Sequence, residues 1–466
     1  MEKFFKLKEH GTNIRTEVIA GLTTFITMAY IIFVNPNILS TTGMDKGAVF
    51  VATILASVVA TLIMALLANV PYAQAPGMGM NAFFTFTVCI ALKFTWQQAL
   101  AIVLISGFVN TVITVTKVRK MIIEAIPEFL QHAISGGIGL FIAYIGFKDA
   151  HILNFTAEAP NVLVKLPDGG VVAKDVVPAL VNFTDPASVL AIIGIVIIVV
   201  LMLLKVRGAI LIGIILSTII GIPMGVTQLP HLTAASFLPP DIGPTFFKLD
   251  LVGLFADPSR LFLVLTTILA FVLSDVFDCI GTFLGTGRKT GIFDAKDEAA
   301  SKKGGIFSSK LDRALFADLT ATTVGSVLGT SNTTTYIESA AGISVGGRTG
   351  LTALVVAVLF LLSLFFSPIA LMIPSAATAP ALIIVGILMM GSIARIKWDE
   401  FEEAASAFFT IVIMPFTYSI ANGVAAGFIF YVITKIVRGR AKEVHIIMYI
   451  VAILFIIRFL VDALRG

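Results

Sequence analysis

Residues 329–342 read GTSNTTTYIESAAG, a stretch rich in hydroxyl groups that lies between two long apolar runs. Lipid offers no hydrogen-bond partners to bare backbone, so a polar interruption at membrane depth must be buried in protein or line a cavity. Glu338 adds to this argument, because an ionisable side chain at that depth is unfavourable and usually functional. The stretch therefore predicts a ligand site inside a membrane.

A second interruption, PGMGMNA at residues 76–82, lies in the other half of the chain. Its proline and glycines disfavour a regular helix and leave backbone N–H and C=O groups for a ligand. Paired interruptions in the two halves of a membrane chain point to the substrate site of a transporter. The alternative is a packing break between helices in which Asn81 is a helix cap.

The composition supports a multi-pass membrane protein. Of the 466 residues, 58% are hydrophobic and 13% are charged, whereas soluble domains carry about 25% charged residues. Apolar runs that can each cross a bilayer recur along the whole chain. Cys89 and Cys279 lie in such runs and predict buried thiols rather than a disulfide. The net charge of +4 reflects basic loops and indicates no nucleic-acid partner.

The apolar pattern predicts an all-α membrane protein with about fourteen segments, in two sets of seven around a polar loop at 228–258. The expected segments are 17–35, 48–70, 80–92, 98–116, 132–148, 187–205, 208–227, 259–285, 312–329, 334–344, 350–373, 378–394, 403–419 and 421–437. Residues 1–16 form a polar lead-in, and 149–186 form a surface loop that can hold a hairpin. The apolar stretch 445–464 has no assigned placement.

The positions of lysine and arginine orient the chain. With the N-terminus inside, the inner loops hold most of the basic residues, and the outer loops hold only Lys46, Lys93, Lys148, Lys165, Lys174, Lys248 and Arg260. Cytoplasmic loops are the basic ones, so we expect a cytoplasmic N-terminus in the cell membrane. The first segment then also serves as the insertion signal.

The two halves resemble each other in sequence. An Ile-Pro pair precedes a small-residue helix at 136–146 in the first half and at 381–391 in the second. Since seven is an odd number of crossings, the second half must be inverted relative to the first. Inverted repeats of this kind support alternating access.

Two groups of acidic residues are the main candidates for chemistry. We expect the helix after the second interruption to begin near Thr334, with Thr333 beside it and Glu338 in its first turn; the alternative role for Glu338 is a helix cap. Asp275 and Asp278 lie three residues apart in an apolar run, so they share one helical face. Burial and mutual repulsion favour a protonated form of at least one of them, which predicts a proton carrier, although a structural role is open for either alone.

The first interruption adds candidates for binding a ligand. A helix restarting near Met80, just after Gly79, places its positive end toward the middle of the membrane. Asn81 offers both a donor and an acceptor, and Phe83 can stack on a flat ring. The sequence contains no phosphate-binding GxxxxGK[ST] loop, which disfavours an ATP-driven pump, and no cofactor is expected.

Several of these stretches together resemble one transporter family. They are RTEVIAGLTTF at 15–25, AYIIFVNP at 29–36, APGMGMNAFF at 75–84, SDVFD at 274–278, GTSNTTTYIES at 329–339, TAPALIIVG at 378–386 and MPFTYSIA at 414–421. The chain resembles the AzgA-type purine permeases of the nucleobase–cation symporters, close to bacterial guanine/hypoxanthine permeases. The resemblance covers almost the full length. Asn332 departs from it, because the relatives usually carry a hydroxyl residue there.

This resemblance implies a core domain at 17–116 and 259–373, and a gate domain at 132–227 and 378–437. Segments 3 and 10 are then short strands followed by half-helices. The implied function is proton-coupled import of guanine or hypoxanthine, with adenine as a further candidate, by an elevator-like movement; a homodimer is compatible with it. The implied site residues are Asn81, Asp275, Asp278 and Glu338.

Three other functions remain as alternatives. An anion carrier of the sulfate/bicarbonate type on a similar fold needs a positive site, whereas the ionisable residues expected at midspan are Asp275, Asp278 and Glu338. An ion channel predicts a ring of pore-lining groups rather than offset interruptions. An intramembrane enzyme needs a nucleophile–base pair or a metal set, and neither is recognisable in the sequence.

Overall fold

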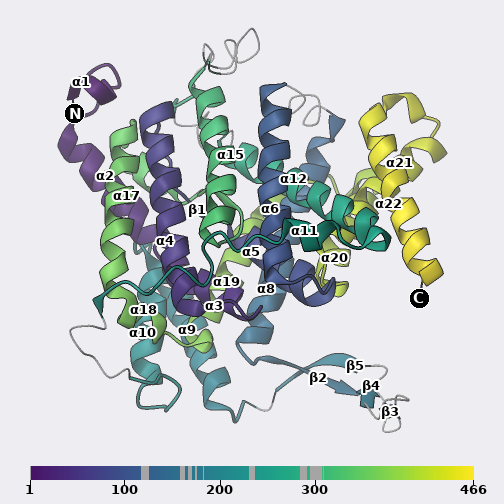
Figure 1. Ribbon diagram of the computed structural model, residues 1–466, viewed down its shortest axis with the longest axis horizontal. Coiled ribbons are helices and arrows are strands. Elements are labelled where there is room, and N and C mark those ends of the chain that lie inside the picture. The colour runs from purple at the N-terminus through teal and green to yellow at the C-terminus, as the bar shows by residue number, and fades with distance from the viewer. Residues whose placement is uncertain are drawn as a thin grey trace.

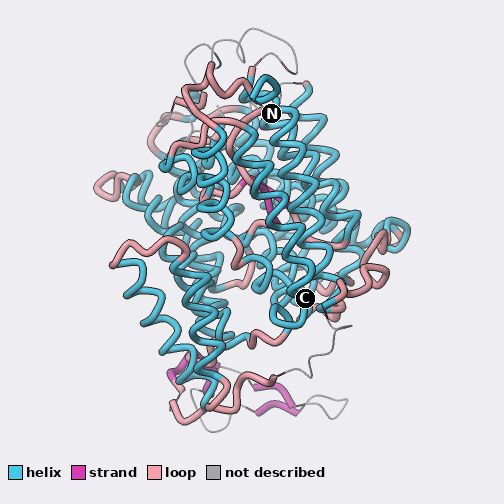
Figure 2. Tube along the Cα trace, turned by 90° about the vertical axis from the view of Figure 1, so that its left-hand side faces the viewer, coloured by secondary structure: helices cyan, strands magenta, loops and turns pink. Residues whose placement is uncertain are grey.

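The computed structural model describes residues 2–116, 125–157, 163–165, 171–173, 176–181, 183–229, 237–283, 291–293, 297, 307 and 309–465. It is mostly helical, and the long helices stand side by side (Figure 1). Two short strands lie in the middle of the helices, where Figure 2 shows them in magenta. This confirms the predicted class, a helical membrane protein with strand-plus-half-helix breaks.

One group of helices combines the first and third quarters of the chain. It consists of α2 (Ile14–Met28), α3 (Ile31–Ser40), α4 (Lys46–Ile63), β1 (Gln74–Pro76), α5 (Met78–Ala82), α6 (Trp96–Val115), α12 (Leu261–Thr282), α15 (Lys310–Leu328), β6 (Thr333–Thr335), α16 (Ser339–Val345) and α17 (Gly350–Ser363). Within it α15 packs against α4 and α6, and α17 packs against α2 and α4. These helices surround the β1–β6 pair.

A second group combines the remaining quarters. It consists of α8 (Glu128–Asp149), α9 (Pro186–Leu203), α10 (Ala209–Gly221), α19 (Ser375–Met390), α20 (Phe401–Phe416), α21 (Ile420–Val437) and α22 (Ile446–Arg465). The assignment of these two groups to the predicted core and gate domains stays a prediction. The smaller helical elements are α1 (Glu2–Phe5), α11 (Leu251–Phe255), α18 (Ser367–Leu371), the π-helical segments Met64–Ala68 and Phe83–Ala91, and the 3-10 helices Pro258–Arg260, Leu364–Phe366, Gly391–Arg395 and Ala441–Glu443.

Local chemistry fixes where several of these helices begin. The side chain of Asp45 accepts from the backbone N–H of Ala48 at 2.7 Å and starts α4. Thr95 and Gln98 form a reciprocal capping box at the start of α6. Both arrangements satisfy backbone N–H groups that a helix N-terminus leaves without partners.

Nine helical segments among the described residues are long and apolar enough to cross a membrane, and three shorter apolar helices accompany them. Their outward residues are hydrophobic, for example Leu203, Val437 and Leu362. An apolar outer surface of this extent suits contact with lipid rather than water. The count of about fourteen segments stays a prediction, because α15 and α20 fall outside those nine.

The two similar small-residue helices pack directly on each other. A Cβ atom on Gly139 of α8 would lie 2.8 Å from the carbonyl oxygen of Gly386 in α19, and one on Gly386 would lie 2.5 Å from that of Gly139. Their backbones therefore touch, as small residues permit between membrane helices.

The loop predicted at 149–186 contains a hairpin. Strand β2 (Leu153–Ala157) pairs with β5 (Val176–Leu180), and β3 (Leu163–Lys165) pairs with β4 (Val171–Ala173). The hairpin extends away from the helices at the end of the molecule opposite the N-terminus (Figures 1 and 2). At the other end of the chain, α22 buries Met448, Ala452 and Phe455 against its neighbours and exposes a second apolar face.

Candidate functional site

The two interruptions meet as an antiparallel strand pair. Gln74 faces Thr335, Ala75 faces Thr334 and Pro76 faces Thr333, so the pairing is centred on Ala75 and Thr334. Antiparallel pairing of corresponding strands is what an inverted repeat predicts. Bonds beyond the strands extend the contact: Gly77 N–H donates to the Asn332 carbonyl at 2.9 Å, and the Tyr336 hydroxyl donates to the Pro76 carbonyl at 2.6 Å.

A half-helix follows each strand. Helix α5 begins at Met78 and continues into the π-helical segment Phe83–Ala91, so Asn81 lies inside the helix and does not cap it. Helix α16 begins at Ser339. The expectation that this helix begins near Thr334 is wrong, because residues 333–335 are used in pairing with β1. Both helices begin close to the strand pair, so their N–H-rich ends lie near it.

Glu338 immediately precedes α16 and is partly exposed. Its side chain makes no capping bond to the helix. Instead, the buried hydroxyl of Tyr30 donates to Glu338 Oε1 at 2.6 Å. Tyr30 lies in the turn between α2 and α3, where the predicted first segment divides into two helices. The capping alternative for Glu338 therefore does not apply.

Asp275 lies in α12 and is fully buried. Its Oδ1 accepts from Asn332 Nδ2 at 2.9 Å, and its Oδ2 accepts from Asn110 Nδ2 at 2.9 Å. The carboxylate is thus attached to the beginning of the second interruption, whereas Glu338 lies at its end. Asp278 also lies in α12, but its side chain falls outside the described part of the structure.

The residues predicted in the first interruption are buried as well. Asn81 Oδ1 accepts from the Ser331 hydroxyl, so Asn81 joins the two interruptions directly. Its Nδ2 has no partner among the described atoms. Met80 is 2% exposed, and a Cβ on Gly79 would lie 2.8 Å from Ile138 Cγ2 of α8. Gly79 therefore marks a close approach between the two helix groups.

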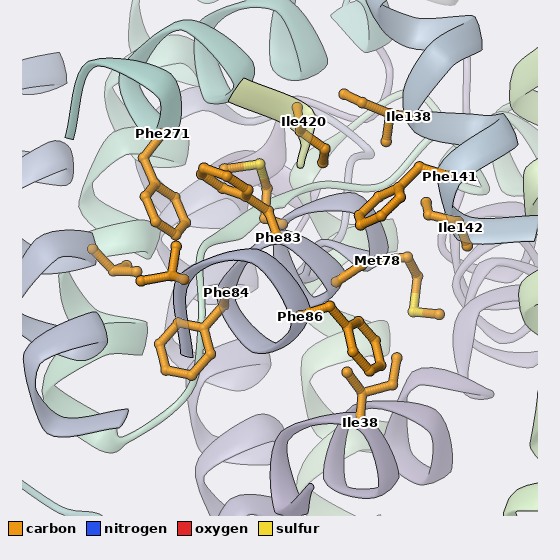
Figure 3. Close-up of a cluster of buried hydrophobic side chains, with 14 of the residues drawn as sticks. Ile38, Met78, Phe83, Phe84, Phe86, Ile138, Phe141, Ile142, Phe271 and Ile420 are labelled. Atoms are coloured by element: carbon orange, nitrogen blue, oxygen red, sulfur yellow. The ribbon is translucent and has the colours of Figure 1, made fainter. Parts of the chain in front are cut away.

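Phe83 is fully buried, and its ring centroid lies 4.6 Å from that of Phe271 in α12. Figure 3 shows the two rings together, with Ile138 and Phe141 of α8 nearby. In this arrangement Phe83 packs in the core, so stacking on a ligand stays a prediction.

Thr333 and Thr334 are each attached to α15 by a hydrogen bond. The Thr333 carbonyl accepts from the Thr322 hydroxyl at 3.1 Å, while Thr333 Oγ1 is buried without a partner among the described atoms. Thr334 Oγ1 lies 3.4 Å from Asp318 Oδ1. The backbone of both residues is engaged in the strand pair.

Asp318 of α15 is a site residue that the sequence analysis missed. Its Oδ1 accepts from the backbone N–H of Thr335 at 2.8 Å, from the Thr335 hydroxyl at 2.7 Å and from Gln74 Nε2 at 3.2 Å. These donors come from both strands, so this buried carboxylate fixes the strand pair to α15. An acidic residue within the predicted segment 312–329 was the available signal.

The carboxylates around the strand pair thus accept from hydroxyl, amide and backbone N–H groups. Such a setting supplies acceptors for a neutral ligand with N–H donors. It does not resemble a site built from lysine or arginine for an anion.

Comparisons with known proteins show which family the chain resembles. Residues 15–426 match the model of the permease family. The chain is 41% identical over 464 residues to the adenine permease AdeP of Escherichia coli, covering 99% of this chain and 97% of that one. It is 41% identical over 471 residues to the guanine/hypoxanthine permease PbuG of Bacillus subtilis, covering 99% of each.

A solved structure shares the fold. The transmembrane domain of the cyanobacterial bicarbonate transporter BicA superposes with a TM-score of 0.59, covering 88% of this chain and 96% of that domain, at 16% identity. This likeness concerns the fold alone and confirms the predicted core-and-gate fold class.

Proposed function

Because this chain belongs to the permease family, we propose that it imports purine nucleobases across the cell membrane by proton symport, with its N-terminus in the cytoplasm. Guanine and hypoxanthine are the first candidates and adenine is a further one, since the similar permeases are named for these bases. The observation that carries the proposal is the strand pair with Glu338 at its edge.

The base binds where the two interruptions meet, between the core and gate groups. Glu338 accepts a purine N–H, and the unpaired Asn81 Nδ2 donates to a ring nitrogen or carbonyl oxygen. Removing one partner of such a hydrogen bond in a site without water weakens binding by about 1–3 kcal/mol. Asp275 supports the second interruption through Asn332.

Coupling follows from the charge of the site. A proton taken up with the base neutralises one acid, for which Glu338, Asp275 and Asp278 are the candidates. The neutral core then crosses the apolar boundary with the gate more easily than a charged one. Movement of the core past the gate exposes the site to the two sides in turn.

Uptake of labelled hypoxanthine tests the proposal. Purified protein in liposomes is assayed at two external pH values, with and without a protonophore, against guanine, adenine, uracil and bicarbonate as competitors. We expect competition by purines and loss of accumulation with the protonophore. Competition by bicarbonate alone would favour the anion carrier, whereas purine uptake insensitive to the pH gradient would remove only the proton coupling.

A further inference from the structure

An arginine side chain binds the far end of each half-helix, and the proposed function gives neither arginine a role. Arg348 Nη1 donates to the carbonyl oxygens of Ile343, in the last turn of α16, and of Gly347, both at 2.7 Å. Arg260 Nη2 donates to the Leu92 carbonyl at 2.8 Å, directly after the π-helical segment that continues α5. A helix C-terminus carries carbonyl groups without helical partners and a partial negative charge, so an arginine stabilises it in both respects.

These contacts hold both arginines at the half-helices. Arg260 and Arg348 are partly buried, and neither guanidinium lies within ion-pair distance of a carboxylate among the described residues. The Arg260 guanidinium also lies 4.2 Å from the centroid of the buried Phe94 ring. A partly buried charge needs acceptors or an aromatic face nearby, and here the carbonyl groups and the Phe94 ring supply them.

Each arginine also connects its half-helix to a longer helix that contributes to the site. Arg260 lies directly before α12, the helix that carries Asp275. The backbone N–H of Arg348 donates to Oε1 of Glu17, a fully buried residue of α2, at 2.9 Å. Helix α2 leads into the turn whose tyrosine hydroxyl donates to the Glu338 carboxylate. Each half-helix is therefore attached at two places, at the strand pair and at an arginine.

The half-helices depend on such attachments because they are short. Helix α16 has seven residues, and α5 has five and continues into nine π-helical residues. Helices of this length are marginal by themselves, so contacts at their ends determine where they lie. Because β1 and β6 are antiparallel, the chain leaves the strand pair in opposite directions, and the two arginines hold opposite sides of the site. A shift at either arginine would move the residues next to the strand pair.

We propose that Arg260 and Arg348 are positioning residues for substrate binding, each of which holds one half-helix at the end away from the strand pair. They act through the half-helices on the groups that contact the base. The inference rests on the proposed function and deepens it, because it adds one positioning residue to each interruption.

The first test measures hypoxanthine uptake by Arg260→Ala and Arg348→Ala in purified protein in liposomes. We expect each substitution to raise KM about tenfold with little change in the apparent Tm, because the half-helix loses a charged hydrogen-bond donor at its end. Arg260→Lys and Arg348→Lys keep a charged donor and should return KM to within about threefold of the parent. Arg438→Ala is the matched control, because Arg438 lies at the end of α21 with its Nε 3.8 Å from Glu402 Oε2. Its KM should equal that of the parent.

Hydrogen–deuterium exchange of the same proteins gives the second readout. Arg348→Ala should raise exchange in residues 339–347, and Arg260→Ala should raise it in residues 78–92, each without a change in the other half-helix. Loss of a merely structural contact would instead raise exchange across several neighbouring helices. Should an alanine variant not fold, Arg260→Gln or Arg348→Gln replaces it with the same expectations.

Three results would count against these statements in different ways. Unchanged KM and unchanged local exchange in both variants would overturn the inference while uptake by the parent upholds the proposed function. A lower Tm and Vmax at unchanged KM would show a structural role alone and would also overturn the inference. Absence of saturable purine uptake by the parent would overturn the proposed function and, with it, the assignment of the arginines to purine binding.

Discussion

Tyr30 shows how a single side chain orients the proposed substrate carboxylate. Tyr30 lies in the turn between α2 and α3, and its hydroxyl donates a hydrogen bond to Glu338 Oε1 at 2.6 Å. Tyr30 itself is 1% exposed and lies next to Tyr336, with ring centroids 6.5 Å apart. The bond leaves Glu338 Oε2 as the second acceptor of a carboxylate that is already fixed in direction.

We therefore expect Tyr30→Phe to weaken substrate binding with little change in folding. A hydrogen bond to a charged group contributes about 1.5–3 kcal/mol, so KM should rise roughly tenfold or more. Uptake kinetics in liposomes measure this. Tyr449→Phe is the control, because Tyr449 donates to the Ala441 carbonyl at 2.9 Å in the α21–α22 connection. Equal KM values for the two variants would show that Tyr30 does not orient Glu338.

At the scale of single residues, the sequence identified candidate site residues that are polar or acidic within apolar segments. Asn81, Asp275 and Glu338 are such residues, and the structure attaches all three to the interruptions. Tyr30, Asn110 and Asp318 were missed, because their importance depends on partners more than a hundred residues away or on a backbone N–H. No local pattern reports such contacts.

At the scale of elements, the glycines of α8 and α19 explain why these two helices lie so close. The apolar periodicity predicted both helices, and the shared small residues predicted their similarity. The sequence did not predict that α8 and α19 pack on each other, because the same glycines could face any neighbouring helix. Likewise, the sequence placed the start of the helix after the second interruption too early, since strand pairing between distant segments used residues 333–335.

We expect Gly386→Ala to destabilise the protein. The new Cβ would lie 2.5 Å from the Gly139 carbonyl oxygen, which is backbone and cannot rotate away. Overpacking of this kind costs about 1–3 kcal/mol. The apparent Tm in detergent, followed by size-exclusion chromatography after heating, measures the loss.

Gly391→Ala is the matched control. Gly391 follows directly at the end of α19, and a Cβ there meets nothing within 4 Å. Its apparent Tm should equal that of the parent. If Gly386→Ala were equally stable, the contact between α8 and α19 would be looser than the structure describes.

At the scale of the whole molecule, the boundary between the two helix groups is largely apolar near the first interruption. Figure 3 shows Met78 of the interruption near Phe141 and Ile142 of α8, and Phe83 of the following π-helical segment between Phe271 and Phe141. Among the described residues, polar contacts between the two groups include Asn37 Nδ2 to Thr378 Oγ1 at 3.2 Å. Another joins Thr87 Oγ1, in the π-helical segment that follows α5, to the Tyr418 carbonyl in the turn between α20 and α21 at 3.0 Å. Such a boundary permits sliding, because apolar contacts have no fixed direction.

If the core moves past the gate during transport, a covalent link across this boundary should stop uptake. Cys89 and Cys279 are first replaced by serine, and Thr87→Cys and Tyr418→Cys are then introduced together. Oxidation should reduce uptake more than about tenfold and reduction should restore it, because each cycle needs the two groups to separate here.

Linking Phe409→Cys to Phe430→Cys is the control, since those rings stack 3.7 Å apart between α20 and α21 within the gate group. This control should transport equally well when oxidised. Full uptake by the cross-linked Thr87–Tyr418 variant would contradict an elevator movement at this boundary and favour a rearrangement confined to the interruptions.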